Sequence, residues 1–180
     1  MPLNQALIGK EYPPVRYEVG REKLREFATS VGETDPVYHD EEAARAAGHP
    51  DIPAVPTFPV VLTLRVGQKV YNDPELGLDY SRVVHGEQEF TYHRPIFAGD
   101  RLLAAGRVAA MEVKGRHELL AIETRVTSED GEPVCSAVVT LISRGTAAAR
   151  RPAGDVDRKG TGGSEGSGGS EDAGGSGGSP

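Results

Sequence analysis

The chain has 180 residues and a formal net charge of −7 at pH 7, and 37% of its residues are hydrophobic. No basic cluster or stripe interrupts this acidic balance, which argues against nucleic acid and an anionic membrane surface as partners. The single cysteine, Cys135, permits no internal disulfide and favours a reducing compartment. We therefore expect a cytoplasmic protein with this thiol buried and, because the first residues hold no long apolar run, neither a signal peptide nor a membrane span.

Composition divides the chain near residue 144. Between Gly160 and Pro180 there are ten glycines and five serines, and Ala173 is the only apolar residue. A segment of this kind buries too little surface to offset its ordering entropy, so we expect a disordered Gly/Ser-rich tail over residues 145–180. Residues 1–144 are enough for one domain with one core.

The first part of the domain predicts a strand and two short helices. Residues 15–19 alternate apolar and polar side chains, as a strand does. Residues 21–31 repeat apolar side chains at helical spacing, and Gly32 ends that helix. Residues 40–48 indicate a second helix, capped by Asp40.

A buried helix is predicted over residues 59–72. Its first half is apolar on nearly every side, and Pro59 suits a first helical turn, where no N–H donor is required. Gly67 costs a helix interior about 1 kcal/mol relative to alanine. We therefore expect another group to pack closely against this glycine.

The remainder of the domain predicts strands. The last three runs are joined by tight turns, including Asp130-Gly131, and indicate an antiparallel meander. One apolar helix followed by long strands predicts an α+β fold in which the sheet wraps around that helix. The four predicted runs are residues 83–96, 100–113, 117–128 and 133–144.

Three motifs carry a family resemblance that covers residue 3 to about residue 144. They are GETDPVYHDEEAARAAG at 32–48, PTF at 56–58 and RPIFAGDRL at 94–102. With these motifs the chain resembles the MaoC-like hot-dog hydratases and dehydratases, and within them is most similar to the substrate-binding subunit of mycobacterial (3R)-hydroxyacyl-ACP dehydratase. The resemblance implies a single hot-dog fold, a curved antiparallel sheet wrapped around one long central helix.

The first motif departs from the family at both catalytic positions. The family pattern G-D-x-N-P-(L/I)-H supplies an Asp and a His that share one water, which is added to an enoyl thioester or removed from a (3R)-hydroxyacyl thioester. Aligned without a gap, the Asp falls on Glu33 and the His on Tyr38. Glu33 moves the carboxylate by one methylene, and a misplacement near 1 Å can cost about 100-fold in rate. A phenol exchanges protons near neutrality far less readily than an imidazole.

The second motif also departs from the family. The resemblance places a backbone N–H that holds the thioester carbonyl at the start of the central helix, and this position falls on Pro56, which has no N–H. Loss of one such donor costs about 100- to 1000-fold in rate. The N–H of Thr57 could substitute only in a rebuilt turn. We expect Pro56, Thr57 and Phe58 to contact the acyl group.

Two interpretations of the neighbouring polar residues remain open. Asp35 and His39, four residues apart, could form a relocated dyad. Alternatively, Asp35 caps the turn at Pro36 and His39 faces solvent. Tyr38 could line an acyl channel or serve only in packing.

No metal or redox cofactor is expected. His85, Glu87 and Glu89 alternate along one predicted strand and would share a face, which could suggest a metal site. No cysteine or closely spaced histidine joins them, so a solvated strand face is the better interpretation.

The resemblance implies a subunit of a type II fatty-acid-synthesis dehydratase. This chain would bind the acyl group, and a MaoC-like partner would supply the Asp/His dyad in a heterodimer. The thioester would arrive on acyl carrier protein or CoA. Three alternatives remain: an active homodimeric (R)-specific enoyl hydratase, a hot-dog thioesterase and a non-enzymatic acyl-thioester binding protein. The thioesterase usually needs an acid on the central helix, and residues 59–72 contain none.

Overall fold

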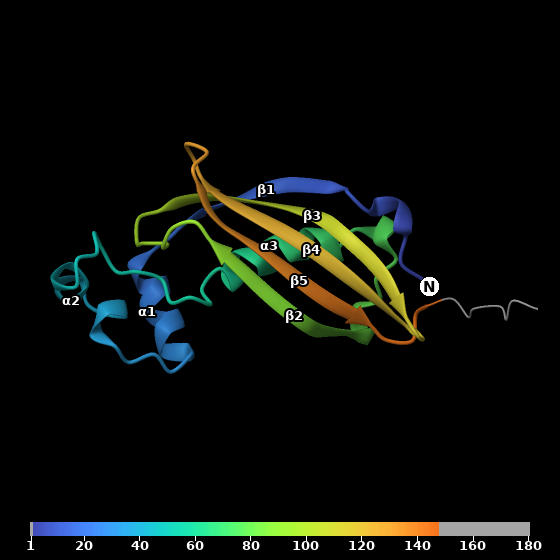
Figure 1. The fold of residues 1–180 in the computed structure, drawn as a ribbon, viewed down its shortest axis with the longest axis horizontal. Coiled ribbons are helices and arrows are strands. Elements are labelled where there is room, and N and C mark those ends of the chain that lie inside the picture. Colours follow the sequence, from blue (N-terminus) through green and yellow to red (C-terminus); the bar gives the residue numbers. More distant parts are fainter. Residues whose placement is uncertain (1, 148–180) are drawn as a thin grey trace, which may run out of the picture. The chain divides into compact units, whose positions relative to one another are not determined.

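The computed structural model describes residues 2–147, in which one antiparallel sheet wraps around a central helix (Figure 1). The α+β hot-dog fold predicted from the sequence is thus confirmed. The tail expected to be disordered lies outside the described residues from residue 148 onward. Gly145 and Thr146, at its predicted start, still bond to the domain: Gly145 N–H donates to His117 Nδ1, and the Thr146 hydroxyl donates to the Ser143 carbonyl.

The sheet contains five strands in the order β1-β3-β4-β5-β2, and all neighbours are antiparallel. The predicted meander is β3-β4-β5, in which tight turns bring consecutive strands side by side. The two edges are β1 and β2. The strands are β1 Glu11–Glu18, β2 Val83–Tyr92, β3 Arg101–Lys114, β4 His117–Ser128 and β5 Pro133–Ser143.

Within residues 2–147, three α-helices accompany the sheet. The central helix α3 (Val60–Tyr71) lies against its concave face, and α1 (Arg21–Ser30) and α2 (Glu41–Ala46) lie at one end (Figure 1). Short 3₁₀ turns complete the connections. They are η1 Gln5–Leu7, η2 Pro36–Tyr38, η3 Pro74–Leu76 and η4 Tyr80–Arg82.

Helix α3 and the sheet form the core by close backbone approach. Leu62, Val66 and Val70 of α3 are at most 1% exposed. Opposite them, a Cβ atom built on Gly106 of β3 would overlap Cγ1 of Val66, so only glycine lets the helix lie this near. The close neighbour predicted at Gly67 is the ring of Tyr71, one turn along the same helix.

A β-bulge in β2 separates polar residues that were predicted to share one face. The register shifts between His85 and Glu87, so His85 pairs with Leu141 whereas Glu87 pairs with Thr140. Directly paired residues share a face, and Leu141 faces the core. His85 therefore lies on the opposite face from Glu87, and the common face expected for His85, Glu87 and Glu89 was wrong because the bulge interrupts the alternation.

Within residues 2–147, no three His, Cys, Asp or Glu side chains gather as metal ligands would. In the same part of the chain, no helix has the length and apolar character needed to span a membrane. Cys135 is 2% exposed, which confirms the burial predicted for it.

Candidate active site

A cleft of about 400 Å³ opens where α3 begins and β2 ends. Its walls come from the segment after α2, from η2 and from the chain that follows β2. The lining is mainly proline and aliphatic side chains, with a few polar groups among them, which is the usual character of a ligand site. The lining residues are Tyr38, His49, Pro53, Ala54, Val55, Pro56, Pro59, Tyr92, His93, Arg94, Pro95 and Ile96.

The turn at residues 32–38 is fixed by its own side chains. The Glu33 carboxylate accepts hydrogen bonds from the N–H groups of Thr34 (2.8 Å) and Asp35 (2.9 Å). Asp35 in turn accepts from the N–H of Val37 (3.0 Å) and caps η2. Both carboxylates therefore satisfy local backbone donors, the usual role of acids in such turns.

His39 is also held by the backbone. Its Nε2 lies 2.8 Å from the carbonyl oxygen of Glu33, so this nitrogen donates the hydrogen bond. The carbonyl of His39 accepts from Nε of Arg25 on α1 (2.6 Å). Neither His39 nor Asp35 lines the cleft, and among the described residues no hydrogen bond joins their side chains.

Tyr38 is the residue of this turn that reaches the cleft. It is partly buried and packs against the core cluster that contains Phe58. The position that the family resemblance assigns to the catalytic histidine thus faces the cleft with a phenol. Glu33, at the position assigned to the catalytic aspartate, does not line it.

The three residues expected to bind the acyl group lie in different environments. Pro56 is exposed and lines the cleft. Thr57 is exposed outside the lining, and its carbonyl accepts from the N–H of Val60. Phe58 is fully buried, and its ring contacts the rings of Phe27 and Tyr17 at centroid distances of 5.4 and 6.3 Å. Its place is in the core beneath the cleft.

Four polar residues that line the cleft were not predicted from the sequence. His49 follows α2, and Tyr92, His93 and Arg94 come from the end of β2 and the segment after it. The signal was present in the motif RPIFAGDRL, whose first residue is Arg94. The prediction of one continuous strand over residues 83–96 hides this signal, because β2 ends at Tyr92.

Arg94 fastens the loop that closes this side of the cleft. Its guanidinium makes a two-point contact with Asp100, with distances of 2.8 and 3.2 Å, and Asp100 also accepts from the N–H of Phe97 (2.9 Å). Such fork-to-fork pairs are strong and geometrically specific. The RPIFAGD motif therefore forms a loop that these contacts hold rigid.

The comparisons with known proteins agree with this architecture. Residues 6–137 match the model of the family described as "FAS1-like, dehydratase domain region". A protein of Saccharopolyspora erythraea called UPF0336 protein is 52% identical over 148 residues, which cover 82% of this chain and 95% of that protein.

Two solved structures are also similar. A chain of the C-terminally truncated HadBC (3R-hydroxyacyl-ACP dehydratase) complex from Mycobacterium tuberculosis is 30% identical, with a TM-score of 0.69 over 76% of this chain and 96% of that chain. A chain of the ChsH1-ChsH2 complex from the same organism shares the fold at 22% identity, with a TM-score of 0.60 over 81% of this chain and 89% of that one.

Proposed function

Since the chain belongs to the FAS1-like dehydratase domain family, we propose that it is the acyl-binding subunit of a (3R)-hydroxyacyl-thioester dehydratase. A second hot-dog subunit, with an intact Asp/His pair, performs the proton transfers. The observation that carries this proposal is the pair of residues that face the cleft at the family's reactive positions, Tyr38 and Pro56.

The chemistry of these positions supports a binding role. Proton transfer to and from a bound water needs two groups within hydrogen-bond reach of one atom. Here a phenol stands in the cleft, whereas Glu33 lies outside the lining and its Oε1 accepts hydrogen bonds from two backbone N–H groups. Pro56 offers no N–H to a developing oxyanion. The aliphatic remainder of the lining suits an alkyl chain.

A comparison of the two sheet edges favours a partner that pairs with β2. In β1 the consecutive residues Pro13 and Pro14 lack N–H donors, and a register shift separates Tyr12 from Val15. Such an edge pairs poorly with another strand. Strand β2 has ten residues and no proline, and its outer row of backbone groups is open. The HadBC relative is itself a complex of two different subunits.

The charges on β2 favour a partner different from this chain. Glu87 and Glu89 lie on one exposed face of the strand and form no salt bridge within residues 2–147. If two copies paired antiparallel through the middle of β2, these glutamates would meet those of the other copy. Like charges directly across a strand pair are destabilising, so a heterodimer is the better assembly.

An active homodimeric hydratase is the second candidate. One observation favours it, because His49 and His93 both line the cleft and an imidazole can exchange protons near neutral pH. A thioesterase has no such support, since α3 reads VVLTLRVGQKVY and carries no acid.

The test compares this chain, a MaoC-like partner with an intact dyad, and the co-expressed pair. Dehydration of (3R)-hydroxyacyl thioesters is followed by absorbance of the enoyl-thioester product. We expect no turnover by this chain, and turnover by the pair that favours longer acyl chains than the partner does by itself. Robust turnover by the isolated chain would replace the subunit proposal with the homodimeric hydratase. The variants His49→Ala and His93→Ala would then identify its acid/base group.

A further inference from the structure

A second hollow, of about 450 Å³, lies at the start of β2 and is lined by basic side chains. Its lining residues are Arg82, Arg116, His117, Arg144 and Gly145. They come from four places: η4, the turn between β3 and β4, the first residue of β4 and the end of β5. The ladder assembles them, because Ser143 of β5 pairs with both Val83 of β2 and Glu118 of β4.

The positive charge of this basic hollow is largely uncompensated. Among the described residues, Arg116 and Arg144 form no salt bridge, and Arg82 has only a 3.4 Å contact with the exposed Asp79. Glu118, the nearest acid on β4, points into the interior and accepts the N–H of Leu3 at 3.0 and 3.2 Å. In the described part of the chain, no carboxylate therefore lines the hollow beside these cations.

The backbone fixes the donors of the hollow. The N–H of Arg144 donates to the carbonyl of Arg82 (3.1 Å), which holds the two arginines side by side. Nδ1 of His117 accepts the N–H of Gly145 (3.2 Å). In the neutral imidazole the proton then resides on Nε2, which becomes a further donor. Guanidinium forks with an added N–H donor suit the oxygens of a phosphate.

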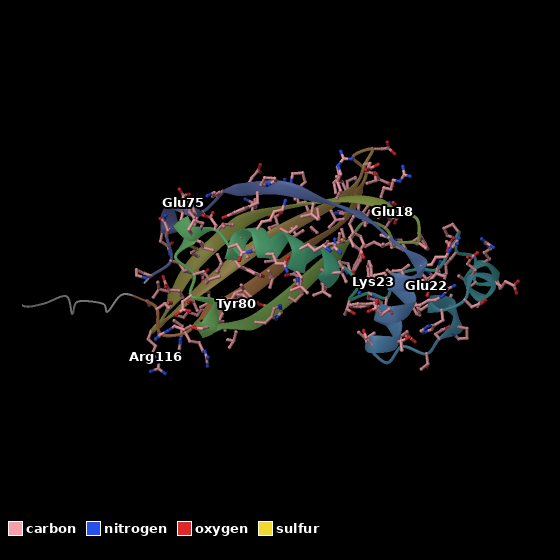
Figure 2. All side chains as sticks on the ribbon, turned by 180° about the vertical axis from the view of Figure 1, so that it is seen from behind. Glu18, Glu22, Lys23, Glu75, Tyr80 and Arg116 are labelled. Carbon is pink, nitrogen blue, oxygen red and sulfur yellow. The ribbon has the colours of Figure 1, made fainter. Side chains whose placement is uncertain are left out.

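The hollow and the cleft lie at opposite ends of β2. Arg82 precedes the strand, whereas Tyr92 and His93 at its end line the cleft. Ten residues of strand span about 30 Å. Figure 2 shows Arg116 at the end of the sheet opposite to Glu22 and Lys23 of α1. The hollow is thus far from the cleft of its own chain.

Pairing of two subunits through β2 brings the hollow close to a different cleft, that of the partner. When two such strands pair antiparallel, the start of one lies beside the end of the other. The basic hollow of this chain then lies next to the end of the partner at which a hot-dog cleft opens.

We propose that the basic hollow binds the phosphate of a 4′-phosphopantetheine thioester whose thioester group enters the partner's cleft, where the Asp/His pair acts. This inference rests on the proposed function, because it needs a hot-dog partner paired at β2. CoA and acyl carrier protein both present this phosphate, so the shared chemistry defines the ligand.

The test measures binding to the co-expressed pair of this chain and its MaoC-like partner, with and without the phosphate. The probes are decanoyl-pantetheine 4′-phosphate and decanoyl-pantetheine, and titration calorimetry gives the Kd of each. The variant is Arg116→Gln with Arg144→Gln. The matched control is Arg16→Gln with Arg101→Gln, which removes the same charge from exposed arginines of β1 and β3.

We expect the phosphate to tighten binding by at least about tenfold in the pair that contains the wild-type chain and in the pair that contains the control. The Arg116/Arg144 variant should lose this difference and keep its affinity for decanoyl-pantetheine. Equal Kd values for the two probes in the wild-type pair, or an unchanged difference in the variant pair, would overturn the inference.

Two further measurements identify the source of the phosphate and separate the two proposals. Decanoyl-CoA and decanoyl-acyl carrier protein are compared as ligands. If the Arg116/Arg144 variant weakens the binding of neither ligand, the inference is also overturned. Phosphate-dependent binding that needs the arginines, without turnover by any co-expressed pair, would count against the proposed function and retain the hollow. In an active pair the variant should raise KM about tenfold and leave kcat unchanged.

Discussion

The hydroxyl of Tyr92 donates a hydrogen bond to the carbonyl oxygen of Pro56, and this bond joins the end of β2 to the turn that precedes α3. Both residues line the cleft. Burial raises the pKa of Tyr92 well above its ordinary value, so the phenol remains a neutral donor. The contact holds one rim of the cleft against the other.

Removing this hydroxyl should loosen the rim. Tyr92→Phe deletes the hydrogen bond and leaves the ring, so the free energy of unfolding should fall by about 1 kcal/mol. Urea denaturation measures the change. Tyr80→Phe is the control, because Tyr80 is 63% exposed and its hydroxyl makes no hydrogen bond to other described residues. An equal effect of the two variants would show that the Tyr92 bond does not contribute.

Two glycines differ in how easily the side chain beside them can move. An alanine at Gly106 must displace Val66, which is 1% exposed in the core, so Gly106→Ala should cost about 1–3 kcal/mol. At Gly67 the obstacle is the hydroxyl end of Tyr71, which can swing aside, and alanine favours the helix. Gly67→Ala should therefore cost much less.

A double mutant tests whether the overlap with Val66 causes the loss of stability in Gly106→Ala. Gly106→Ala combined with Val66→Ala should be more stable than the sum of the two single changes predicts, because the overlap is gone. Strict additivity would mean that Val66 is not the obstacle.

The sequence predicts those elements well whose patterns are local, and it misses features that depend on pairing between distant residues. Strand β4 was predicted with the bounds observed, and α3 within one residue at each end, because their patterns are local and uninterrupted. Strand β1 begins at Glu11, earlier than the predicted residue 15, because Pro13 and Pro14 hid its first half. The bulge at Gly86 was missed because its pairing with β5 is a long-range property.

The candidate site was predicted in part for the same reason. The turn over residues 32–38 was recognised from a contiguous motif, and the capping role considered for Asp35 is present. The cleft itself joins η2, the segment after α2 and the end of β2, which are distant in the sequence. His49 and His93 carry no local signal that would bring them together. Phe58 reads like a ligand contact in the motif, but its side chain turns into the core.

Alkaline pH should destabilise the domain through Cys135. Burial raises the pKa of this thiol to about 11. The unfolded chain releases the proton nearer pH 9, so the folded state holds more protons between about pH 9 and 11 and stability falls with rising pH in that window. Cys135→Ala should remove a loss on the order of 2 kcal/mol. Urea denaturation at about pH 8 and pH 10.5 compares the variant with the wild type. An unchanged loss of stability in the variant would assign the effect to the buried tyrosines.

Asp35 and His39 should prove to be structural. Asn can cap as Asp does, so Asp35→Asn should change stability little, whereas His39→Ala should cost about 1 kcal/mol through the lost bond to Glu33. In an active pair, neither variant should change turnover by more than about threefold. A loss of about 100-fold or more in folded protein would establish the relocated dyad instead.

Glu87 and Glu89 should limit self-association of the isolated chain. Glu87→Gln with Glu89→Gln removes the repulsion between two copies paired at β2, so the variant should form homodimers at lower concentration than the wild type. Sedimentation at low and high salt measures this, and added salt should shift the wild type toward the variant because it screens exposed charges. The matched control is Glu11→Gln with Glu18→Gln on β1, whose proline-interrupted edge should leave association unchanged. A wild-type chain that is already a tight homodimer, unaffected by salt or by either double variant, would remove the electrostatic argument for a different partner.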